Sequence, residues 1–128
     1  MNWRSHDLAP CAGQILCAVE ELPDGLCKEF RYGEGAYAFS LLLHRSSTGV
    51  KAYVNRCPHF SLPLNTRPNE FVMPDAARVM CAFHGAVFRL DNGYCEAGPA
   101  ASSFLEPVEV IVRNGAVCIA DSATLDIS

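Results

Sequence analysis

Two short segments each combine a cysteine with a histidine, a pair of side chains suited to binding a metal. The first is Cys57-Pro58-His59 and the second is Cys81-Ala82-Phe83-His84, with twenty-one residues between His59 and Cys81. Each segment offers one soft thiolate and one imidazole. Four donors of this kind suit either a tetrahedral zinc ion or an iron–sulfur centre with two cysteine and two histidine ligands. The spacing alone leaves both kinds of metal site open.

The order and the surroundings of these segments resemble those of the Rieske family, whose members carry a C-x-H box followed by a C-x-x-H box. After the second box, the likeness to bacterial Rieske ferredoxins continues through Gly85-Ala86-Val87-Phe88, Asp91-Asn92-Gly93 and Gly98-Pro99. It covers roughly residues 50 to 120. Upstream of these residues, the expected strands are similar only in type and order. The chain is therefore interpreted as a Rieske-type ferredoxin.

The resemblance implies a [2Fe–2S] cluster as cofactor, with Cys57 and Cys81 on one iron and His59 and His84 on the other. With two thiolates and two neutral imidazoles, the oxidised cluster is formally neutral and reaches a charge of −1 on reduction. Four thiolates would instead take it from −2 to −3. Because an electron is added more easily to a neutral site, imidazole ligation raises the reduction potential.

Further residues are implied to support or expose the cluster. Gly85 directly follows the second box, Gly98 would allow close approach of a third loop, and Pro99 would stiffen that loop. An ordinary turn is the alternative for either glycine. His59 and His84 are expected to be the least buried ligands, so that electrons leave through their imidazoles. Nearby apolar side chains are expected to rim a docking patch: Phe60, Leu62 and Pro99.

Four positions depart from high-potential members of the family. Where those members carry an additional cysteine in each box, joined as a disulfide, this chain has Leu62 and Phe83. Where they carry a serine and a tyrosine that donate hydrogen bonds to sulfur, it has Ala86 and Phe88. Because such bonds raise the potential, their loss predicts a value in the lower part of the Rieske range of roughly −150 to +300 mV. We expect a low-potential carrier, suited to supplying an oxygenase.

The predicted function is a soluble one-electron carrier between a reductase and an oxygenase-type acceptor, not an enzyme in its own right. An oxygenase needs a second iron held by two histidines and a carboxylate, and only His6 and His44 remain for it. One alternative is an accessory subunit similar to the small subunit of assimilatory nitrite reductase, which can lack the cluster. Another is a zinc-stabilised interaction module, although zinc fingers usually pair cysteine with cysteine.

The elements that must position the boxes are strands. Runs rich in β-branched and aromatic residues recur between turn signals, and none sustains helical periodicity for three turns. We expect one all-β Rieske domain over residues 1–128, with an antiparallel β-sandwich-like scaffold and a loop-rich cluster-binding lobe at about residues 56–100. Four prolines indicate a loop over residues 57–74. The expected strands are 14–19, 27–32, 36–44, 50–55, 78–81, 86–90, 108–112 and 116–120.

Three groups of turn residues predict hairpins between these strands. They are Ser46–Gly49, Asp91–Gly93 and the pair Asn114-Gly115. The last pair tolerates the positive φ angles of a type I′ turn.

Composition narrows the classes of function. Fourteen acidic and ten basic residues give a net charge of −4, the wrong sign for neutralising nucleic-acid phosphates. Seven cysteines is an odd number, which favours a reducing compartment over a secreted disulfide framework. The sequence has no signal-peptide core and no run of about 18 apolar residues. We therefore expect a cytoplasmic protein without nucleic-acid or membrane partners. The resemblance implies that its partners are redox proteins.

Five cysteines lie outside the two boxes. We expect them to be small buried hydrophobic residues, as cysteine usually is in apolar strands. Cys95 is singled out, because it falls between the second box and Gly98 and could lie near the cluster. His6 and His44 are expected to be surface or packing residues. The five cysteines are Cys11, Cys17, Cys27, Cys95 and Cys118.

Overall fold

The computed structural model describes residues 3–35, 38–47, 49–58, 62–67, 69–98 and 101–120. Within these ranges the chain forms eleven β-strands and two short 3-10 helices, Trp3–Ser5 and Val19–Glu21. The strands form three sheets in which neighbouring strands are antiparallel. The predicted all-β fold is confirmed. No helix in the described ranges has the length and apolar character needed to cross a lipid bilayer.

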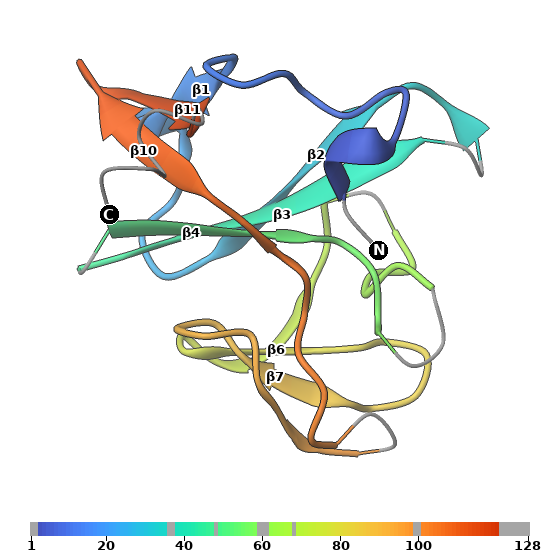
Figure 1. Cartoon of the computed structure of the whole chain (residues 1–128). Helices are drawn as coiled ribbons and strands as arrows, with labels where there is room; N and C mark the ends of the chain where they lie inside the picture. Colours follow the sequence, from blue (N-terminus) through green and yellow to red (C-terminus); the bar gives the residue numbers. More distant parts are fainter. Residues whose placement is uncertain are drawn as a thin grey trace.

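Two of the sheets form the scaffold, which occupies the upper part of Figure 1. Apolar side chains from both sheets, such as Leu41 and Ile119, share one buried core. The first sheet contains, in spatial order, β2 (Cys27–Tyr32), β3 (Phe39–Ser46), β4 (Gly49–Val54) and β9 (Pro107–Val108). The second contains β1 (Ile15–Ala18), β11 (Ala116–Ile119) and β10 (Val110–Arg113).

The third sheet forms the lobe, which lies below the scaffold in Figure 1. Its core contains Phe88 and Leu64, both completely buried, and also Tyr53 from the scaffold strand β4. The Tyr53 hydroxyl donates a buried hydrogen bond of 2.9 Å to the Leu90 carbonyl, which fastens the lobe to the scaffold. The lobe strands are β5 (Val72–Asp75), β6 (Arg78–Met80), β7 (Val87–Arg89) and β8 (Cys95–Ala97).

Strand β3 is covered on both faces, which explains its uninterrupted apolar sequence. Successive side chains of a strand point to opposite faces of the sheet. Leu41 and Leu43 belong to the scaffold core, whereas Leu42 belongs to the lobe core. All three side chains are completely buried. A strand buried on both faces is typically a continuous hydrophobic run rather than an alternating one.

The expectation of a loop over residues 57–74 is wrong at its end, because β5 begins at Val72 and includes Pro74. Proline is tolerated there because β5 is an edge strand, where part of the backbone has no ladder partner. The pairing register with β6 is also irregular between Val72 and Asp75. Strand β8 at the other edge was not predicted, since three residues are too few to produce a sequence pattern.

The three predicted hairpin turns are confirmed. Ser46 pairs with Gly49 at the end of the β3–β4 hairpin. Residues 91–93 lie between the paired strands β7 and β8. Asn114 and Gly115, between β10 and β11, have φ angles of +53° and +76°.

One predicted strand, 108–112, is divided between the two scaffold sheets. Val108 pairs with Ala52 of β4, whereas Val110 pairs with Ile119 of β11. The chain therefore passes from one sheet to the other at Glu109, and a hydrophobic pattern cannot reveal such a crossing.

Candidate metal centre

The two box cysteines lie at the ends of strands and inside the lobe core. Cys57 follows β4 of the scaffold, and Cys81 follows β6 of the lobe. Both are completely buried and belong to the same group of packed residues. All seven cysteines lie in the described ranges and none of them forms a disulfide. Two thiols from distant parts of the sequence are thus available in one buried region.

Each box cysteine begins a loop that closes in the same way. The Cys57 backbone N–H donates to the Leu62 carbonyl at 2.7 Å, and the Cys81 N–H donates to the Ala86 carbonyl at 2.7 Å. The acceptor is the fifth residue after the cysteine in both cases. We call residues 57–62 the first ligand loop and residues 81–86 the second ligand loop. Their shared closure is what a centre with two similar binding segments requires.

A backbone hydrogen bond connects the second ligand loop to the segment that follows the first one. The Ala82 N–H, in the second loop, donates to the carbonyl of Leu64, two residues after the first loop, at 2.9 Å. Leu64 is completely buried in the lobe core. The sequence separates these residues widely, and the fold brings their backbones into contact.

His84 is placed differently from the two box cysteines. His84 is exposed at the turn of the second ligand loop, as expected for a ligand through which electrons leave. His59 lies outside the described residues, as do Phe60 and Pro99. Of the expected apolar rim, Leu62 is described, and its exposed fraction is 37%.

Gly85 and Gly98 lie at or near the second ligand loop, and the two positions require glycine for different physical reasons. A Cβ atom on Gly98 would lie 2.7 Å from the Ala86 Cα and 3.1 Å from the Gly85 carbonyl oxygen, too close for any side chain. The backbone of Gly98 thus lies close against the second ligand loop, and its expected approach to the cluster stays a prediction. Gly85 has open space around it but a φ angle of +74°, so its role is conformational.

The donor set suits a two-iron centre. Each iron of such a centre takes two protein ligands, so two buried thiols together with the exposed His84 imidazole are compatible with it. Within the described ranges, no three histidine, cysteine, aspartate or glutamate side chains converge on one point. One of the four proposed ligands, His59, lies outside those ranges.

Comparison with known proteins identifies the family. The Rieske [2Fe–2S] domain family matches residues 13–114, most of the chain. This chain belongs to the Rieske [2Fe–2S] domain family. Because a Rieske domain carries a [2Fe–2S] cluster, the predicted fold family and cofactor are confirmed. The predicted electron-transfer role is supported for the matched residues, because the family is defined by its [2Fe–2S] cluster and one relative is a ferredoxin subunit.

Individual relatives differ in how much of their length the match covers. The ferredoxin subunit of 3-phenylpropionate/cinnamic acid dioxygenase from Photorhabdus laumondii is 30% identical over 105 residues, which are 82% of this chain and 90% of the relative. Human apoptosis-inducing factor 3 is 29% identical over 109 residues, 80% of this chain. The chain spans only 16% of the length of that human protein.

Solved structures with the same fold come from carbazole 1,9a-dioxygenase systems. The ferredoxin from Nocardioides aromaticivorans IC177 has a TM-score of 0.67 and 18% identity, covering 88% of this chain and all of that one. A structure of the reduced oxygenase–ferredoxin complex of carbazole 1,9a-dioxygenase matches with a TM-score of 0.69 and 16% identity, covering 87% of this chain and 29% of that one.

The residues that depart from high-potential Rieske proteins lie directly at the site. Ala86 and Phe88 are completely buried in the core that contains both box cysteines. Neither side chain can donate a hydrogen bond to sulfur. Leu62 and Phe83, which stand in place of the bracing disulfide, are 37% and 46% exposed. Apolar side chains therefore occupy the positions at which the resemblance places hydroxyls and a disulfide in high-potential members of the family.

Cys95 lies near Cys57, one of the two box cysteines. It is completely buried in the same core as Cys57, and its thiol donates a hydrogen bond of 3.2 Å to the Ala97 carbonyl. Burial raises the pKa of the Cys95 thiol, and the nearby Cys57 thiol acts in the same direction. Cys11 contradicts the expectation of burial, because it is exposed in a turn before β1.

The other residues weighed in the sequence have packing roles. Cys17 and Cys118 are buried, Cys27 is partly buried, and burial raises the pKa of the Cys27 thiol to about 12. The His6 ring packs against Phe39 at a centroid distance of 5.2 Å. His44 is buried, and its Nε2 atom lies 2.9 Å from the Ala76 carbonyl.

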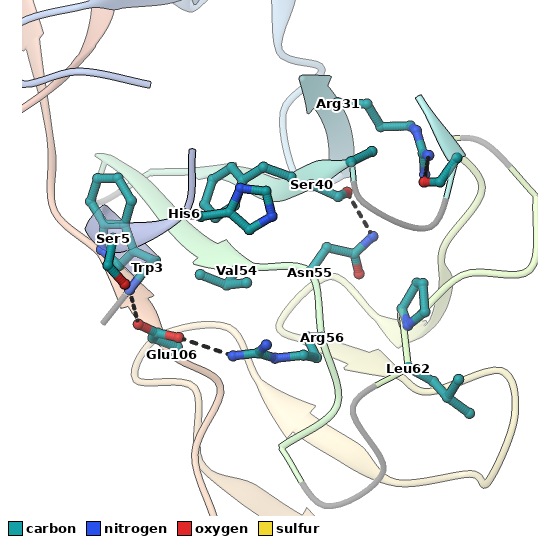
Figure 2. A pocket seen from close by; sticks show the side chains of 14 residues that line it. Trp3, Ser5, His6, Arg31, Ser40, Val54, Asn55, Arg56, Leu62 and Glu106 are labelled. Atoms are coloured by element: carbon teal, nitrogen blue, oxygen red, sulfur yellow. Dashed lines mark hydrogen bonds and ion pairs between the residues drawn. The ribbon is translucent and has the colours of Figure 1, made fainter. Parts of the chain in front are cut away.

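A cavity of about 530 Å³ lies between the scaffold and the start of the first ligand loop (Figure 2). Arg56, next to Cys57, is paired with Glu106 at 3.4 Å, and Glu106 also accepts a hydrogen bond of 2.8 Å from the Trp3 backbone N–H. Leu62 lies on the opposite wall in Figure 2. These contacts were not predicted, because they join residues about 50 and 100 positions apart in the sequence.

Asn55 and Asn65, on either side of the first ligand loop, were also missed. Both are buried, with exposed fractions of 4% and 7%. Asn55 Oδ1 accepts the Leu64 backbone N–H at 3.0 Å, and its Nδ2 donates to Asn65 Oδ1 at 2.8 Å. The only signal available in the sequence was the position of these asparagines. Asn55 lies two residues before Cys57, and Asn65 lies three residues after Leu62.

Proposed function

We propose that this Rieske protein takes single electrons from a reductase and passes them to an oxygenase-type acceptor. The observation that carries the proposal is the pair of ligand loops with the same closure, each beginning with a completely buried cysteine. The exposed His84 on the second loop supports a route for electrons to the surface.

The proposed ligands are Cys57 and Cys81 on one iron and His59 and His84 on the other. Burial of both thiols supports an inner position for the cysteine-bound iron, and the exposed His84 imidazole supports an outer position for the other iron. When bound, the cluster accepts and releases one electron at a time. The chain positions it, keeps water from its inner side and presents its outer side to a partner.

The proposed partners are supported by what the relatives are. One is the ferredoxin subunit of a dioxygenase, and a chain with the same fold occurs in a solved oxygenase–ferredoxin complex of another dioxygenase. A reductase is included because a carrier needs an electron donor. We infer no nucleic-acid partner, given the net charge of −4, and no membrane partner. A cytoplasmic location is part of the proposal and is supported by the odd number of cysteines.

The ligand assignment is tested by comparing His84→Ala with Cys95→Ala. Both variants change a side chain near the site, but only His84 is a proposed ligand. The unchanged protein should contain two iron and two acid-labile sulfide ions per chain and give Rieske visible and EPR spectra. His84→Ala should lose these spectra, and Cys95→Ala should keep them. Unchanged spectra in His84→Ala would refute the assignment.

The carrier function is tested by replacing the ferredoxin of a three-component ring-hydroxylating dioxygenase with this protein. With the reductase and the oxygenase of that system, the wild-type chain should restore product formation, and His84→Ala should not. A colourless, zinc-containing protein would contradict the proposal at the outset. Restoration of product by His84→Ala at the wild-type rate would also contradict it.

A further inference from the structure

Glu29, in the middle of β2, is a buried carboxylate with an unusually complete set of partners. The exposed fraction of its side chain is 4%. Its oxygens accept hydrogen bonds from the Ser40 hydroxyl at 2.8 Å and from the Asn69 backbone N–H at 2.9 Å. Burying an ionised carboxylate is costly unless it is hydrogen-bonded or paired, and Glu29 meets that condition.

The same carboxylate also binds both asparagines that flank the first ligand loop. Asn65 Nδ2 donates to Glu29 Oε1 at 2.9 Å, and Asn55 Nδ2 lies 3.4 Å from Glu29 Oε2. Figure 2 shows Asn55 directed toward Ser40, another donor to Glu29. One anion on the scaffold thus holds side chains on both sides of the loop.

The hydrogen bonds continue from Glu29 to both ligand loops. Asn55 accepts the Leu64 N–H at 3.0 Å, and the Leu64 carbonyl accepts the Ala82 N–H at 2.9 Å. Ala82 is the neighbour of Cys81, and Asn55 precedes Cys57 by two residues. The network therefore ends next to the two proposed cysteine ligands.

The charge on Glu29 is retained at neutral pH and is only partly balanced. Burial by itself would raise the pKa of Glu29, but hydrogen bonds from Asn69, Ser40 and Asn65 and the charge of Arg31 outweigh it and hold the pKa below its usual value. The Arg31 guanidinium lies 3.6 Å away, and 40% of its side chain is exposed. Solvent screens the arginine more than the buried carboxylate.

We propose that Glu29 is a positioning residue for the first ligand loop and that its buried negative charge lowers the reduction potential of the cluster. Reduction adds a negative charge to the cluster, and a fixed anion nearby opposes that addition. Because the anion is buried, salt screens it weakly. This inference rests on the proposed ligands Cys57 and Cys81.

The test compares Glu29→Gln with Glu70→Gln in the cluster-loaded protein. Glutamine keeps the shape of the side chain and removes its charge, and Glu70 is an exposed carboxylate of the same charge close to Asn69 in sequence. For Glu29→Gln, the ratio of reduced to oxidised cluster at a fixed applied potential should rise by about tenfold, which is about 59 mV for one electron. The rise should persist at high salt. For Glu70→Gln the ratio should change less than twofold.

A second variant keeps the inference testable if Glu29→Gln does not hold its cluster. Arg31→Gln leaves the hydrogen bonds to Glu29 in place and removes the positive charge that balances Glu29. The ratio of reduced to oxidised cluster should therefore fall instead of rising. An intact Rieske EPR spectrum with an unchanged ratio in Glu29→Gln would overturn the inference. If Glu29→Gln loses the cluster, an unchanged ratio of reduced to oxidised cluster in Arg31→Gln would overturn the inference. Absence of a Rieske spectrum in the wild-type protein would instead refute the proposed ligands.

Discussion

The first and second ligand loops close with the same backbone hydrogen bond but are supported by different parts of the chain. The second loop joins two paired strands, β6 and β7, and the backbone of Gly98 lies against it. The first loop follows β4 but has no strand directly after it, and the side chains of Asn55 and Asn65 hold its surroundings. The comparison indicates that crowding of the backbone should damage the second loop. Loss of polar side chains should damage the first loop.

The largest effect is expected from Gly98→Ala. The new Cβ atom would lie 2.7 Å from the Ala86 Cα, and the φ angle of +93° is unfavourable for any residue with a side chain. The backbone of the second loop would have to move. We expect the free energy of unfolding to fall by about 3 kcal/mol, measured by urea denaturation of the cluster-loaded protein.

Gly85→Ala is the matched control for Gly98→Ala. It has a similar positive φ angle of +74° but nothing within 4 Å of its Cβ position. It should therefore cost only the conformational strain of about 1–2 kcal/mol. Equal losses in the two variants would show that close packing at Gly98 is not important.

Asn55→Ala should weaken the first loop. The Leu64 backbone N–H would lose its acceptor in a completely buried place, which costs about 1–3 kcal/mol. We expect a lower free energy of unfolding and faster loss of visible absorbance when the protein is incubated with an iron chelator. Asn92→Ala removes an asparagine that accepts the Tyr94 N–H at an exposed turn, and it should have a smaller effect. A greater loss in Asn92→Ala would contradict the comparison.

Ala86→Ser should raise the reduction potential without a large loss of stability. It places a hydroxyl at a buried position of the second loop where high-potential relatives have one. One hydrogen bond to sulfur, worth about 1 kcal/mol, corresponds to a few tens of millivolts. Voltammetry of Ala82→Ser, an exposed position in the same loop, provides the control. A lower potential in Ala86→Ser would contradict the explanation of the low potential.

The smallest effect on stability is expected from lowering the pH. The pKa of Glu29 is lower in the folded protein than in the unfolded chain, so its contribution to stability is present above the unfolded pKa and is lost as the pH falls through the folded one. Stability of the wild-type protein should thus decline more steeply below about pH 4.5 than that of Glu29→Gln. Thermal unfolding as a function of pH measures the difference, and parallel curves would contradict it.

The sequence predicted the parts of this molecule that depend on local patterns. The strand 27–32 was predicted with the bounds that β2 has, and Asn114-Gly115 predicted its turn because few other residue pairs tolerate positive φ. The burial of Cys95 near Cys57 was anticipated from its position in the chain.

What the sequence did not reveal depends on contacts between distant residues. Glu29 looks like one polar residue in an alternating strand, and its partner Asn69 is 40 positions away. Pro74 suggested a loop, because nothing in the local sequence indicates that its strand would lie at a sheet edge. A close approach was expected at Gly98, but its neighbour, the Ala86 backbone, was likewise not predicted.

The central claim, a cluster held by two cysteines and two histidines on paired loops, is tested most directly by pulsed EPR of the dithionite-reduced protein. The account predicts hyperfine couplings from two imidazole nitrogens, together with an intact cluster in Cys95→Ala. A reduced cluster without nitrogen couplings, or one that disappears in Cys95→Ala, would contradict it.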